Sequence, residues 1–464
     1  MATAALFLAA TGLAAASFTV HQMLDGLGAE VDPGFPYYAG RSAESIASEI
    51  RANGYSQVHY VVTNDAAIRR DLIDAFHKEG LPVWYLTFCH VAYSTADFPK
   101  GWEAWKMSLR NSPGKDYTRL CMNNPGYIAF KRARIAASMK RYPFDGVELV
   151  EPFWPDAPGP SSDTYGCLCA HCRAAFLKDH PEETAMPEFT DASSPRWYKS
   201  NPELYRKWMD SRVKGIARFL NATLDGPGGV RRRRPDVPTM VWTLVQDSPN
   251  AVAALREAQG NDAGEMAHAV HPSAVCLQTN WMDWSRSELP PDYLKKYAPF
   301  VKHLRDLSPG TAFTFQVDTG SLAPSRQTYT WLKSADATAR KMGARGTVNY
   351  EYFITKSMYD DPPRLVEARP RQGGVSLVFQ KRVDAGRASD AANYHVTGPQ
   401  GEVVSVTKAR ADGNMIHLSV RGLKPGKRYR VLVNEMVDTP SLWLFKGYPG
   451  HTVRGLKATF RGQG

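Results

Sequence analysis

The sequence predicts an α/β protein in which a (β/α)8 barrel of the TIM type is followed by a small all-β sandwich. Between residues 18 and 356, short apolar segments alternate with helical segments, and eight strand segments can be counted. A segment rich in proline and glycine follows at 357–374, and from 375 to 464 short alternating strands replace the helical periodicity. This regular alternation favours a closed barrel, and a doubly wound open sheet is the alternative.

Most helices between the predicted strands have a recognisable start or stop signal. Ser42 caps a helix that ends at Gly54, and Asn64 caps one that ends at Gly80. Further helices are predicted at about 127–140, 202–224, 251–267, 292–307 and 329–342. The predicted strands span residues 18–23, 57–62, 82–88, 147–151, 239–245, 274–278, 312–317 and 346–353.

The C-terminal part contains several short strands with turn signals between them. They are predicted at 375–380, 393–396, 403–407, 415–420 and 429–434. The segments 392–396, 403–406 and 423–434 resemble the immunoglobulin-like modules that are appended to bacterial surface and secreted proteins. The resemblance implies an immunoglobulin-like β-sandwich over 375–464.

Composition and charge indicate a globular protein without a nucleic-acid partner. The 464 residues are 43% apolar and 22% charged, which suffices for a large core. The net charge is +11, but the basic residues are interleaved with acids. Only residues 231–234 form an arginine cluster, and glycines and prolines on both sides indicate a solvated loop.

The N-terminal segment 1–17 is an apolar run of mostly alanine and leucine. Its end, Ala14-Ala15-Ala16, suits cleavage at small residues, although no positive residues precede it. We interpret it as the remnant of a secretory signal, which predicts a secreted or periplasmic protein. The alternative is a short first helix that covers the bottom of the barrel. No other segment approaches the ~18 apolar residues that a membrane span needs.

Three of the six cysteines, Cys167, Cys169 and Cys172, lie together in the loop after the fourth strand. The C-x-C-x-x-C spacing suits a soft metal, but structural zinc requires four ligands and no second C-x-x-C is present. In an exported protein, a disulfide that pins this loop is the simpler interpretation. A zinc site and free thiols stay open as alternatives, and no catalytic metal or cofactor is predicted.

The fourth strand carries two glutamates that a buried strand does not need for packing. A desolvated carboxylate is unfavourable unless it is paired or hydrogen-bonded, so Glu148 and Glu151 are either ion-paired structural groups or functional ones. Strand parity points Glu148 into the barrel. Glu151 falls nominally on the opposite face, but it directly precedes Pro152 and can turn upward at the rim.

Polar residues follow almost every predicted strand at the end where a barrel enzyme carries its site. Aromatic rings fall in the same layer, and such rings next to hydrogen-bonding groups suit a polyhydroxylated ligand. We expect about half of the histidines and aromatics to serve only packing. The candidate ligand-binding residues are His21, His59, His90, Trp154, Asp247, Gln278, Trp281, Gln316 and Asn349.

Two stretches carry a resemblance to a known group of proteins. Residues 144–152, Phe-Asp-Gly-Val-Glu-Leu-Val-Glu-Pro, and the cysteine segment 167–176 resemble a large, mostly uncharacterised group of bacterial TIM-barrel glycoside hydrolases. The resemblance implies carbohydrate hydrolysis without specifying the sugar. Chitinase-type enzymes continue a similar strand as D-x-D-x-E, whereas Val150 stands here in place of the middle acid, which argues against their substrate-assisted mechanism.

The predicted function is therefore glycoside hydrolysis by two carboxyl groups. Glu151 is the predicted general acid, Glu351 ranks first as its partner, and Asp318 ranks second, while Glu148 and Asp283 are further candidates. A non-catalytic carbohydrate-binding or cell-surface protein is the alternative, and the absence of H-x-H and H-E-x-x-H argues against a zinc hydrolase. The sandwich supplies none of these residues, so a chain ending near Arg371 is expected to fold and stay active. The oligomeric state is left open.

Overall fold

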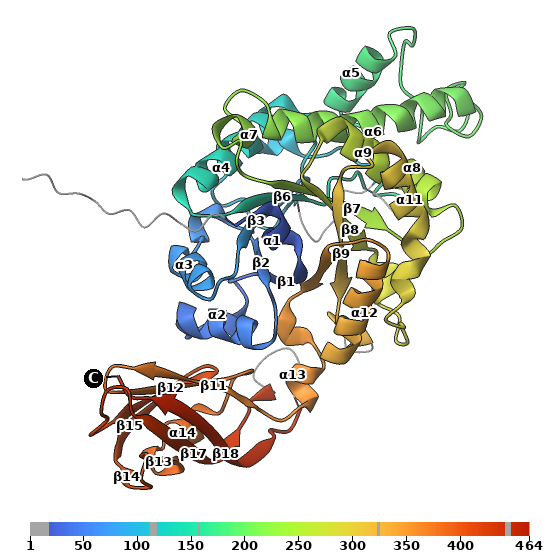
Figure 1. Ribbon diagram of the computed structural model, residues 1–464. Helices are drawn as coiled ribbons and strands as arrows, with labels where there is room; N and C mark the ends of the chain where they lie inside the picture. Colours follow the sequence, from blue (N-terminus) through green and yellow to red (C-terminus); the bar gives the residue numbers. More distant parts are fainter. Residues whose placement is uncertain (1–17, 112–117, 156–157, 323–324, 441–446, 464) are drawn as a thin grey trace, which may run out of the picture.

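The computed structural model describes residues 18–111, 118–155, 158–322, 325–440 and 447–463, and the predicted signal remnant lies outside them. The chain forms a barrel with a separate β-sandwich packed against one side (Figure 1). The barrel is closed and parallel, with the strand order β1-β10-β9-β8-β7-β6-β3-β2, which confirms the predicted fold class. Its strands are β1 (Gly26–Val31), β2 (Gln57–Val61), β3 (Val83–Phe88), β6 (Gly146–Val150), β7 (Thr239–Val245), β8 (Ala274–Thr279), β9 (Ala312–Asp318) and β10 (Gly346–Tyr350).

Helices surround the barrel and begin at the capping residues that the sequence offers. The Ser42 side chain accepts a hydrogen bond from the Ser45 amide and starts the first outer helix. Asn64, by contrast, caps a short 3-10 turn, and the helix that follows begins only at Arg70. The main helices are α2 (Ala43–Ala52), α3 (Arg70–Lys78), α4 (Pro125–Arg141), α6 (Pro202–Leu224), α8 (Ala251–Gln259), α9 (Ala263–Val270), α11 (Ala298–Leu307) and α12 (Tyr329–Lys341). None of the helices in the described ranges is both long and apolar enough to cross a membrane.

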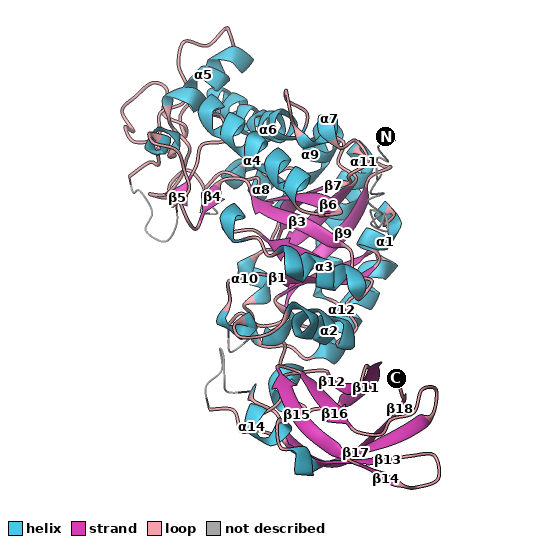
Figure 2. Ribbon diagram, turned by 90° about the vertical axis from the view of Figure 1, so that its left-hand side faces the viewer, coloured by secondary structure: helices cyan, strands magenta, loops and turns pink. Residues whose placement is uncertain are grey.

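The prediction of a first strand at 18–23 is wrong. Residues Val20–Leu24 form a short helix, α1, with a capping box between Thr19 and Gln22. Met23 and Leu24 are buried and join the inner core of the barrel, where the Met23 carbonyl accepts a hydrogen bond from Trp84 Nε1 at 3.0 Å. The true first strand starts at Gly26, and α1 closes the bottom of the barrel, at the end opposite β4 (Val91–Ala92), β5 (Thr118–Arg119) and α10 (Trp281–Trp284) in Figure 2.

Gly146 shows why the fourth barrel strand begins with glycine. A Cβ atom at this position would lie 2.3 Å from Cε3 of Trp84 and 2.8 Å from Cε of Met23. The Trp84 ring, which is fully buried, therefore fills the lower barrel only because residue 146 has no side chain. The Phe-Asp-Gly motif of the sequence thus reflects packing at the bottom of the barrel, while the chemistry lies at the other end of the same strand.

The C-terminal domain consists of two four-stranded antiparallel sheets, which confirms an all-β sandwich. Their orders are β11-β12-β16-β15 and β14-β13-β17-β18. The segment predicted as a linker contains α13 (Ser357–Asp360) and the edge strand β11, which pairs with β12. The strands are β11 (Leu365–Arg371), β12 (Gly374–Phe379), β13 (Tyr394–Thr397), β14 (Val403–Val404), β15 (Val406–Asp412), β16 (Met415–Val420), β17 (Arg428–Val437) and β18 (Thr452–Arg461).

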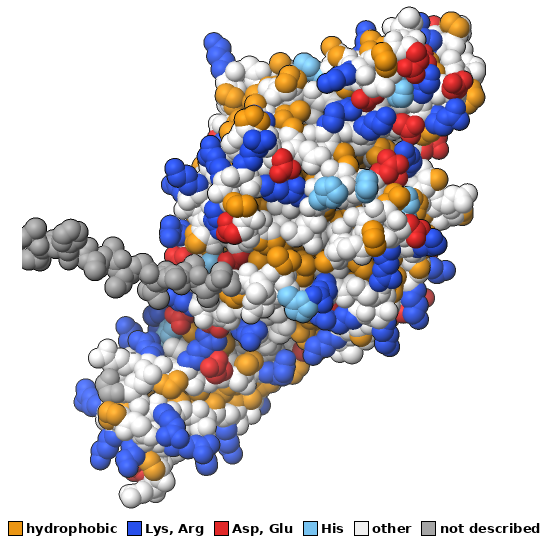
Figure 3. Space-filling view, turned by 45° about the horizontal axis from the view of Figure 1, so that its top comes forward, with side chains coloured by type: hydrophobic (Ala, Val, Ile, Leu, Met, Phe, Trp, Pro, Cys, Tyr) orange, Lys and Arg blue, Asp and Glu red, His pale blue; other side chains and the backbone are white. Residues whose placement is uncertain are grey.

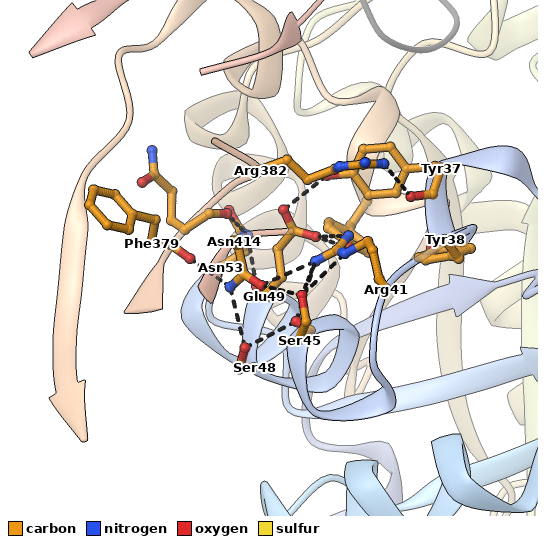
Figure 4. Close-up of polar contacts among 12 residues, drawn as sticks. Tyr37, Tyr38, Arg41, Ser45, Ser48, Glu49, Asn53, Phe379, Arg382 and Asn414 are labelled. Atoms are coloured by element: carbon orange, nitrogen blue, oxygen red, sulfur yellow. Dashed lines mark hydrogen bonds and ion pairs between the residues drawn. The ribbon is translucent and has the colours of Figure 1, made fainter. Parts of the chain in front are cut away.

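The sandwich contacts the barrel through buried polar groups around α2 (Figure 4). Asn414, fully buried at the β15–β16 turn, accepts hydrogen bonds from Arg41 Nη2 at 3.1 Å and Ser45 Oγ at 2.9 Å. Its amide nitrogen donates to Ser48 Oγ at 3.3 Å and to the carbonyl of Phe379 at 2.8 Å. The turn approaches α2 so closely that a Cβ at Gly413, where φ is +61°, would lie 2.4 Å from Arg41 Nε.

On the face shown in Figure 3, the basic side chains do not gather into one patch. In Figure 3, lysine and arginine side chains are scattered over both the barrel and the sandwich, with acidic side chains between them. The prediction of a loop at the arginine cluster is wrong, because Val230–Arg233 form a short helix, α7. In this segment Arg231 binds Asp225 at 3.0 Å, and Arg234 binds Asp236 at 2.9 Å. These arginines are thus used in local ion pairs.

Candidate active site

A cavity of about 720 Å³ opens at the carboxyl ends of the barrel strands. All eight strands contribute to its wall, which is the usual position of the site in this fold. Four acidic residues face it, from β1, from the loop after β1, from the residue after β6, and from the end of β9. No lysine, arginine or histidine lines it among the described residues. The acidic, amide and large aromatic side chains that line it include Glu30, Asp32, Glu151, Trp242, Gln278, Trp284, Gln316, Asp318 and Tyr350.

Glu151 lies at the rim because the backbone turns sharply after β6. Its φ of +55° is unusual for a residue with a side chain, and such strain is typically kept where a site needs it. The Glu151 carbonyl accepts hydrogen bonds from the ring Nδ1 of His90 at 2.7 Å and from the Phe153 amide at 2.9 Å. Burial raises the pKa of the Glu151 carboxyl to about 7, against a smaller opposing effect of a hydrogen bond from Gln278.

Asp318, the last residue of β9, is a second carboxyl of the cavity and is held differently. One of its oxygens accepts hydrogen bonds from the amides of Gly320 at 2.7 Å and Ser321 at 2.8 Å, and the other accepts one from the Ser321 hydroxyl. Burial raises the pKa of Asp318, while these three donors act in the opposite direction because they favour the charged form. Asp318 is thus held in a fixed orientation by three donors that all contact its carboxyl oxygens.

Glu30 and Asp32 were missed by sequence reasoning because the first strand was misplaced. Glu30 is buried in β1, and its pKa is raised well above the usual range by burial and by the neighbouring carboxyls of Glu148, Glu351 and Asp318, with an opposing hydrogen bond from Gln316. Burial also raises the pKa of Asp32, whose carboxylate accepts from the Gly34 amide at 2.9 Å. The signal available was the Glu-Val-Asp run after an apolar segment, but two glycines in that segment obscured the strand.

Glu148 points into the barrel as predicted, but it lies below the cavity and does not line it. Its carboxylate is 2.5 Å from His59 Nδ1 and accepts a hydrogen bond from Trp242 Nε1 at 2.8 Å. Both Glu148 and His59 are fully buried. The interpretation as a paired structural group therefore applies to these two, and the catalytic and ligand-binding roles predicted for them are not supported by their position.

The first-ranked partner acid, Glu351, is turned away from the cavity. Its carboxylate accepts hydrogen bonds from the Asp32 amide at 2.5 Å and from the Tyr38 hydroxyl at 2.7 Å, and it is fully buried. The prediction assigned the two faces of this strand the wrong way round, because Tyr350 lines the cavity. Asn349, a predicted ligand-binding residue, points outward, and its side-chain nitrogen donates a hydrogen bond to Tyr55 Oη at 3.0 Å. Glu351 instead fixes the loop that carries Asp32.

The other predicted residues divide into those at the cavity and those elsewhere. Gln278 and Gln316 line it, as expected from the ends of their strands. His21 lies at the bottom of the barrel, 2.7 Å from Asp25, and so cannot contact a ligand in this cavity. His90 is buried behind Glu151, and burial lowers its pKa to about 4, so its neutral ring supports the Glu151 backbone.

Two predicted stacking residues are also displaced from the cavity. Trp154 is buried against α6, where its Nε1 donates to the Arg212 carbonyl at 3.0 Å. Trp281 is 61% exposed on α10 and does not line the cavity, and Asp247 forms an ion pair with Arg286 at 3.1 Å. Trp284, one turn after Trp281, supplies the aromatic face instead.

The predicted disulfide is not formed, since all six cysteines are free. Cys167, Cys169 and Cys172 gather instead with Cys121, and the four side chains are placed so that they could hold one metal ion. None of the four lines the cavity. They form a separate centre, outside the candidate active site.

No protein-family model and no curated protein matches the chain. The structure is similar to a β-galactosidase from the psychrophilic Marinomonas ef1 over 70% of this chain and 53% of that one, at 13% identity and a TM-score of 0.45. It is similar to the glycoside hydrolase domain of PelA from Pseudomonas aeruginosa over 71% of this chain and 95% of that one, at 13% identity and a TM-score of 0.36. It is also similar to the GH36 α-galactosidase AgaA from Geobacillus stearothermophilus over 85% of this chain and 55% of that one, at 11% identity and a TM-score of 0.38.

The chain spans about half the length of these galactosidases. Identities and TM-scores in this range establish no shared activity. The fold is defined by the strand order of the structure itself: a closed parallel barrel of eight strands, joined to an all-β domain.

Proposed function

We propose that the protein is a glycoside hydrolase in which Glu151 is the general acid and Asp318 the second carboxyl. The observation that carries the proposal is the state of Glu151: a partly buried carboxyl that lines the cavity at the mouth of the barrel and whose pKa is raised by desolvation to about 7. A general acid works best when its pKa is close to the operating pH, because it then holds a proton and can still release it.

The two carboxyls are held in ways that suit different roles. Desolvation favours the protonated form of Glu151, and the hydrogen bond from Gln278 opposes it only in part. Asp318 accepts three hydrogen bonds from the Gly320–Ser321 turn, which stabilise a negative charge. In this proposal Glu151 protonates the leaving glycosidic oxygen, and Asp318 acts on the anomeric carbon, directly or through a water molecule.

The remaining wall suits a sugar. Trp284 and Trp242 offer flat apolar surfaces, and Gln278, Gln316 and Tyr350 add amide and hydroxyl groups to the same wall. The side-chain oxygens of Gln278 and Gln316 are buried and have no protein partner, so they are available to accept hydrogen bonds from ligand hydroxyls. A neutral, hydroxyl-rich ligand fits this combination better than an anionic one, because none of the residues that the structure describes in the cavity wall is basic.

The experiment is reducing-sugar release from a panel of polysaccharides and oligosaccharides, with Glu151→Gln as the test variant. The expected loss of turnover is roughly 10²- to 10⁴-fold, as is typical when a general acid is removed. Glu203→Gln, an exposed residue in the first turn of α6, is the matched control and should keep full activity.

A non-catalytic carbohydrate-binding protein is the competing function, and the same panel, tested with wild-type protein, separates the two. If wild-type protein binds an oligosaccharide by calorimetry but releases no reducing sugar from any member of the panel, the hydrolase proposal fails and the binding function stands. Turnover of Glu151→Gln within threefold of wild type would instead move the acid role to another residue.

A further inference from the structure

Four cysteines from two distant parts of the chain meet on one side of the barrel. Cys121 follows β5 and precedes α4, while Cys167, Cys169 and Cys172 lie just before and within α5 (Ala170–Asp179). Their sulfur atoms all lie within 4.8 Å of one another. Cys121, Cys167 and Cys172 are buried, and Cys169 is half-buried.

The spacing of the sulfur atoms is that of a shared ligand sphere. Cys121 Sγ lies 3.5 Å from Cys169 Sγ and 3.6 Å from Cys172 Sγ, far longer than the ~2.05 Å of a disulfide bond. Four thiolates at the corners of a tetrahedron, each about 2.3 Å from a zinc ion, are separated by roughly 3.8 Å. One sulfur atom, that of Cys121, is close to two others at once, which pairwise disulfides do not explain.

The surroundings of the cluster supply the hydrogen bonds that usually support thiolate ligands. Asn123 Nδ2 donates to Cys172 Sγ at 3.4 Å, and the backbone amide of Cys172 donates to the sulfur of Cys169. Such contacts fix the ligand orientation and offset part of the negative charge. They are arranged on both sides of the cluster, one from each of the two chain segments.

We propose that Cys121, Cys167, Cys169 and Cys172 bind one structural Zn²⁺ ion. Four thiolates fill a tetrahedral zinc sphere and leave no position for a substrate or a water molecule, so the ion is not part of the proposed hydrolysis. The sequence motif contains only three of the ligands, and the fourth, Cys121, comes from the excursion between β3 and α4.

The position of the site indicates what the ion does. It joins the excursion after β3 to the excursion after β6, and both excursions begin at the cavity, where Tyr93, Ser94 and Glu151 line the wall. Trp154, three residues after Glu151, lines a small cavity together with Cys167 and Cys172. The ion therefore reinforces a junction between two long loops that backbone hydrogen bonds already join, such as those from Arg110 N to Tyr165 O at 2.9 Å and from Leu168 N to Ser108 O at 2.8 Å.

The test is the metal content of the full chain, purified under reducing conditions without chelators and measured by inductively coupled plasma mass spectrometry. One zinc per chain is expected. Cys121→Ser should reduce zinc below about 0.2 per chain, whereas Cys89→Ser and Cys276→Ser, which replace buried cysteines outside the cluster, should retain one. Zinc release from wild-type protein by an organomercurial, followed with a coloured zinc indicator, gives the same stoichiometry if Cys121→Ser fails to fold.

Replacement of zinc by cobalt adds a spectroscopic test of the ligand set. A tetrathiolate site gives intense sulfur-to-cobalt absorption that is absent from Co²⁺ bound by nitrogen or oxygen ligands. Wild-type protein that contains no zinc and takes up none from added zinc sulfate would overturn the proposal. Stoichiometric iron in place of zinc would also overturn it, as would an unchanged zinc content in folded Cys121→Ser. Disulfide-linked peptides from these four cysteines, found after the protein has been reduced and then refolded, would have the same consequence.

Discussion

Asn414 is the residue on which the contact between sandwich and barrel most depends, and its replacement by alanine is expected to destabilise the whole chain. Its side chain makes hydrogen bonds to Arg41, Ser45, Ser48 and Phe379, two through its oxygen and two through its nitrogen. Every one of these partners except the Phe379 carbonyl belongs to the barrel domain. Asn414 itself has no solvent exposure.

The size of the effect follows from these four hydrogen bonds. A typical buried hydrogen bond contributes about 1 kcal/mol net, and a buried group left without a partner loses about 1 to 3 kcal/mol. Ser45 keeps a second acceptor in the Asp412 carbonyl, and Arg41 keeps its ion pair with Glu49 at 2.5 Å, so not every partner is left unsatisfied. We therefore expect Asn414→Ala to lower the free energy of unfolding by about 3 to 5 kcal/mol.

The assay is equilibrium unfolding in urea, followed by tryptophan fluorescence. Asn434→Ala is the matched control: it makes the same substitution in the same domain, at an exposed site, and should change the free energy of unfolding by less than about 1 kcal/mol. A loss below 1 kcal/mol in Asn414→Ala, or an equal loss in both variants, would refute the reasoning. A lower transition midpoint with an unchanged slope is the expected form of the result.

The same contacts change the expectation for a shortened chain. The sequence predicted that a chain ending near Arg371 would fold and remain active. In the structure, such a cut removes β12, the partner of β11, and exposes the polar face of α2 that Asn414 and Asp412 cover. We now expect the shortened chain to be less stable or insoluble. A soluble chain with a cooperative unfolding transition and full activity would show that the sandwich is dispensable.

Further predictions concern the cavity. Asp318→Asn is expected to lower turnover at least about 10²-fold, whereas Glu351→Gln should mainly lower stability. Initial rates and urea midpoints of both variants test this. A larger loss of turnover in Glu351→Gln than in Asp318→Asn would contradict our assignment. Trp284→Ala should raise KM about tenfold or more with a smaller change in kcat, which steady-state kinetics measures. Activity should fall as pH rises through about 7, where Glu151 loses its proton.

The raised pKa of Glu151 also predicts how stability depends on pH. Because the folded pKa of about 7 exceeds the usual value of 4.5, its contribution to stability is present below pH 4.5 and is lost as pH rises to 7. The shift corresponds to about 3 kcal/mol for this buried group. The free energy of unfolding, measured in urea at pH 5 and pH 7.5, should fall between these pH values in wild type and not in Glu151→Gln. An equal change in both proteins would contradict the assignment.

The sequence identified the barrel because strand and helix signals alternate strongly over most of its length. Seven of the eight barrel strands overlap their predicted ranges, and Glu151 was found from the conflict between a buried strand and a charged residue. The first strand failed because its glycines weaken the apolar signal, while the apolar residues of α1 imitate a strand. A helix of five residues is too short for periodicity to decide.

The remaining errors concern partners that lie far apart in the sequence. Nothing near Cys167 indicates that Cys121 completes its cluster. Nothing near Glu351 indicates that the Asp32 amide and Tyr38 occupy its carboxylate. The alternation itself holds in β10, but its phase was assigned the wrong way round: Tyr350 faces the cavity, so Asn349 and Glu351 point away from it.

The hydrogen bond between Glu351 and the Asp32 amide has a consequence for synthesis of the chain. The two residues are 319 positions apart, and β1 must wait for β10 before the barrel can close. While the ribosome is still translating the last barrel strand, β1 and β9 are unpaired edges and the loop that carries Asp32 lacks its anchor. A nascent chain therefore has no complete cavity until β10 and Glu351 have been made, and until then the open edges of β1 and β9 are exposed to edge-to-edge association.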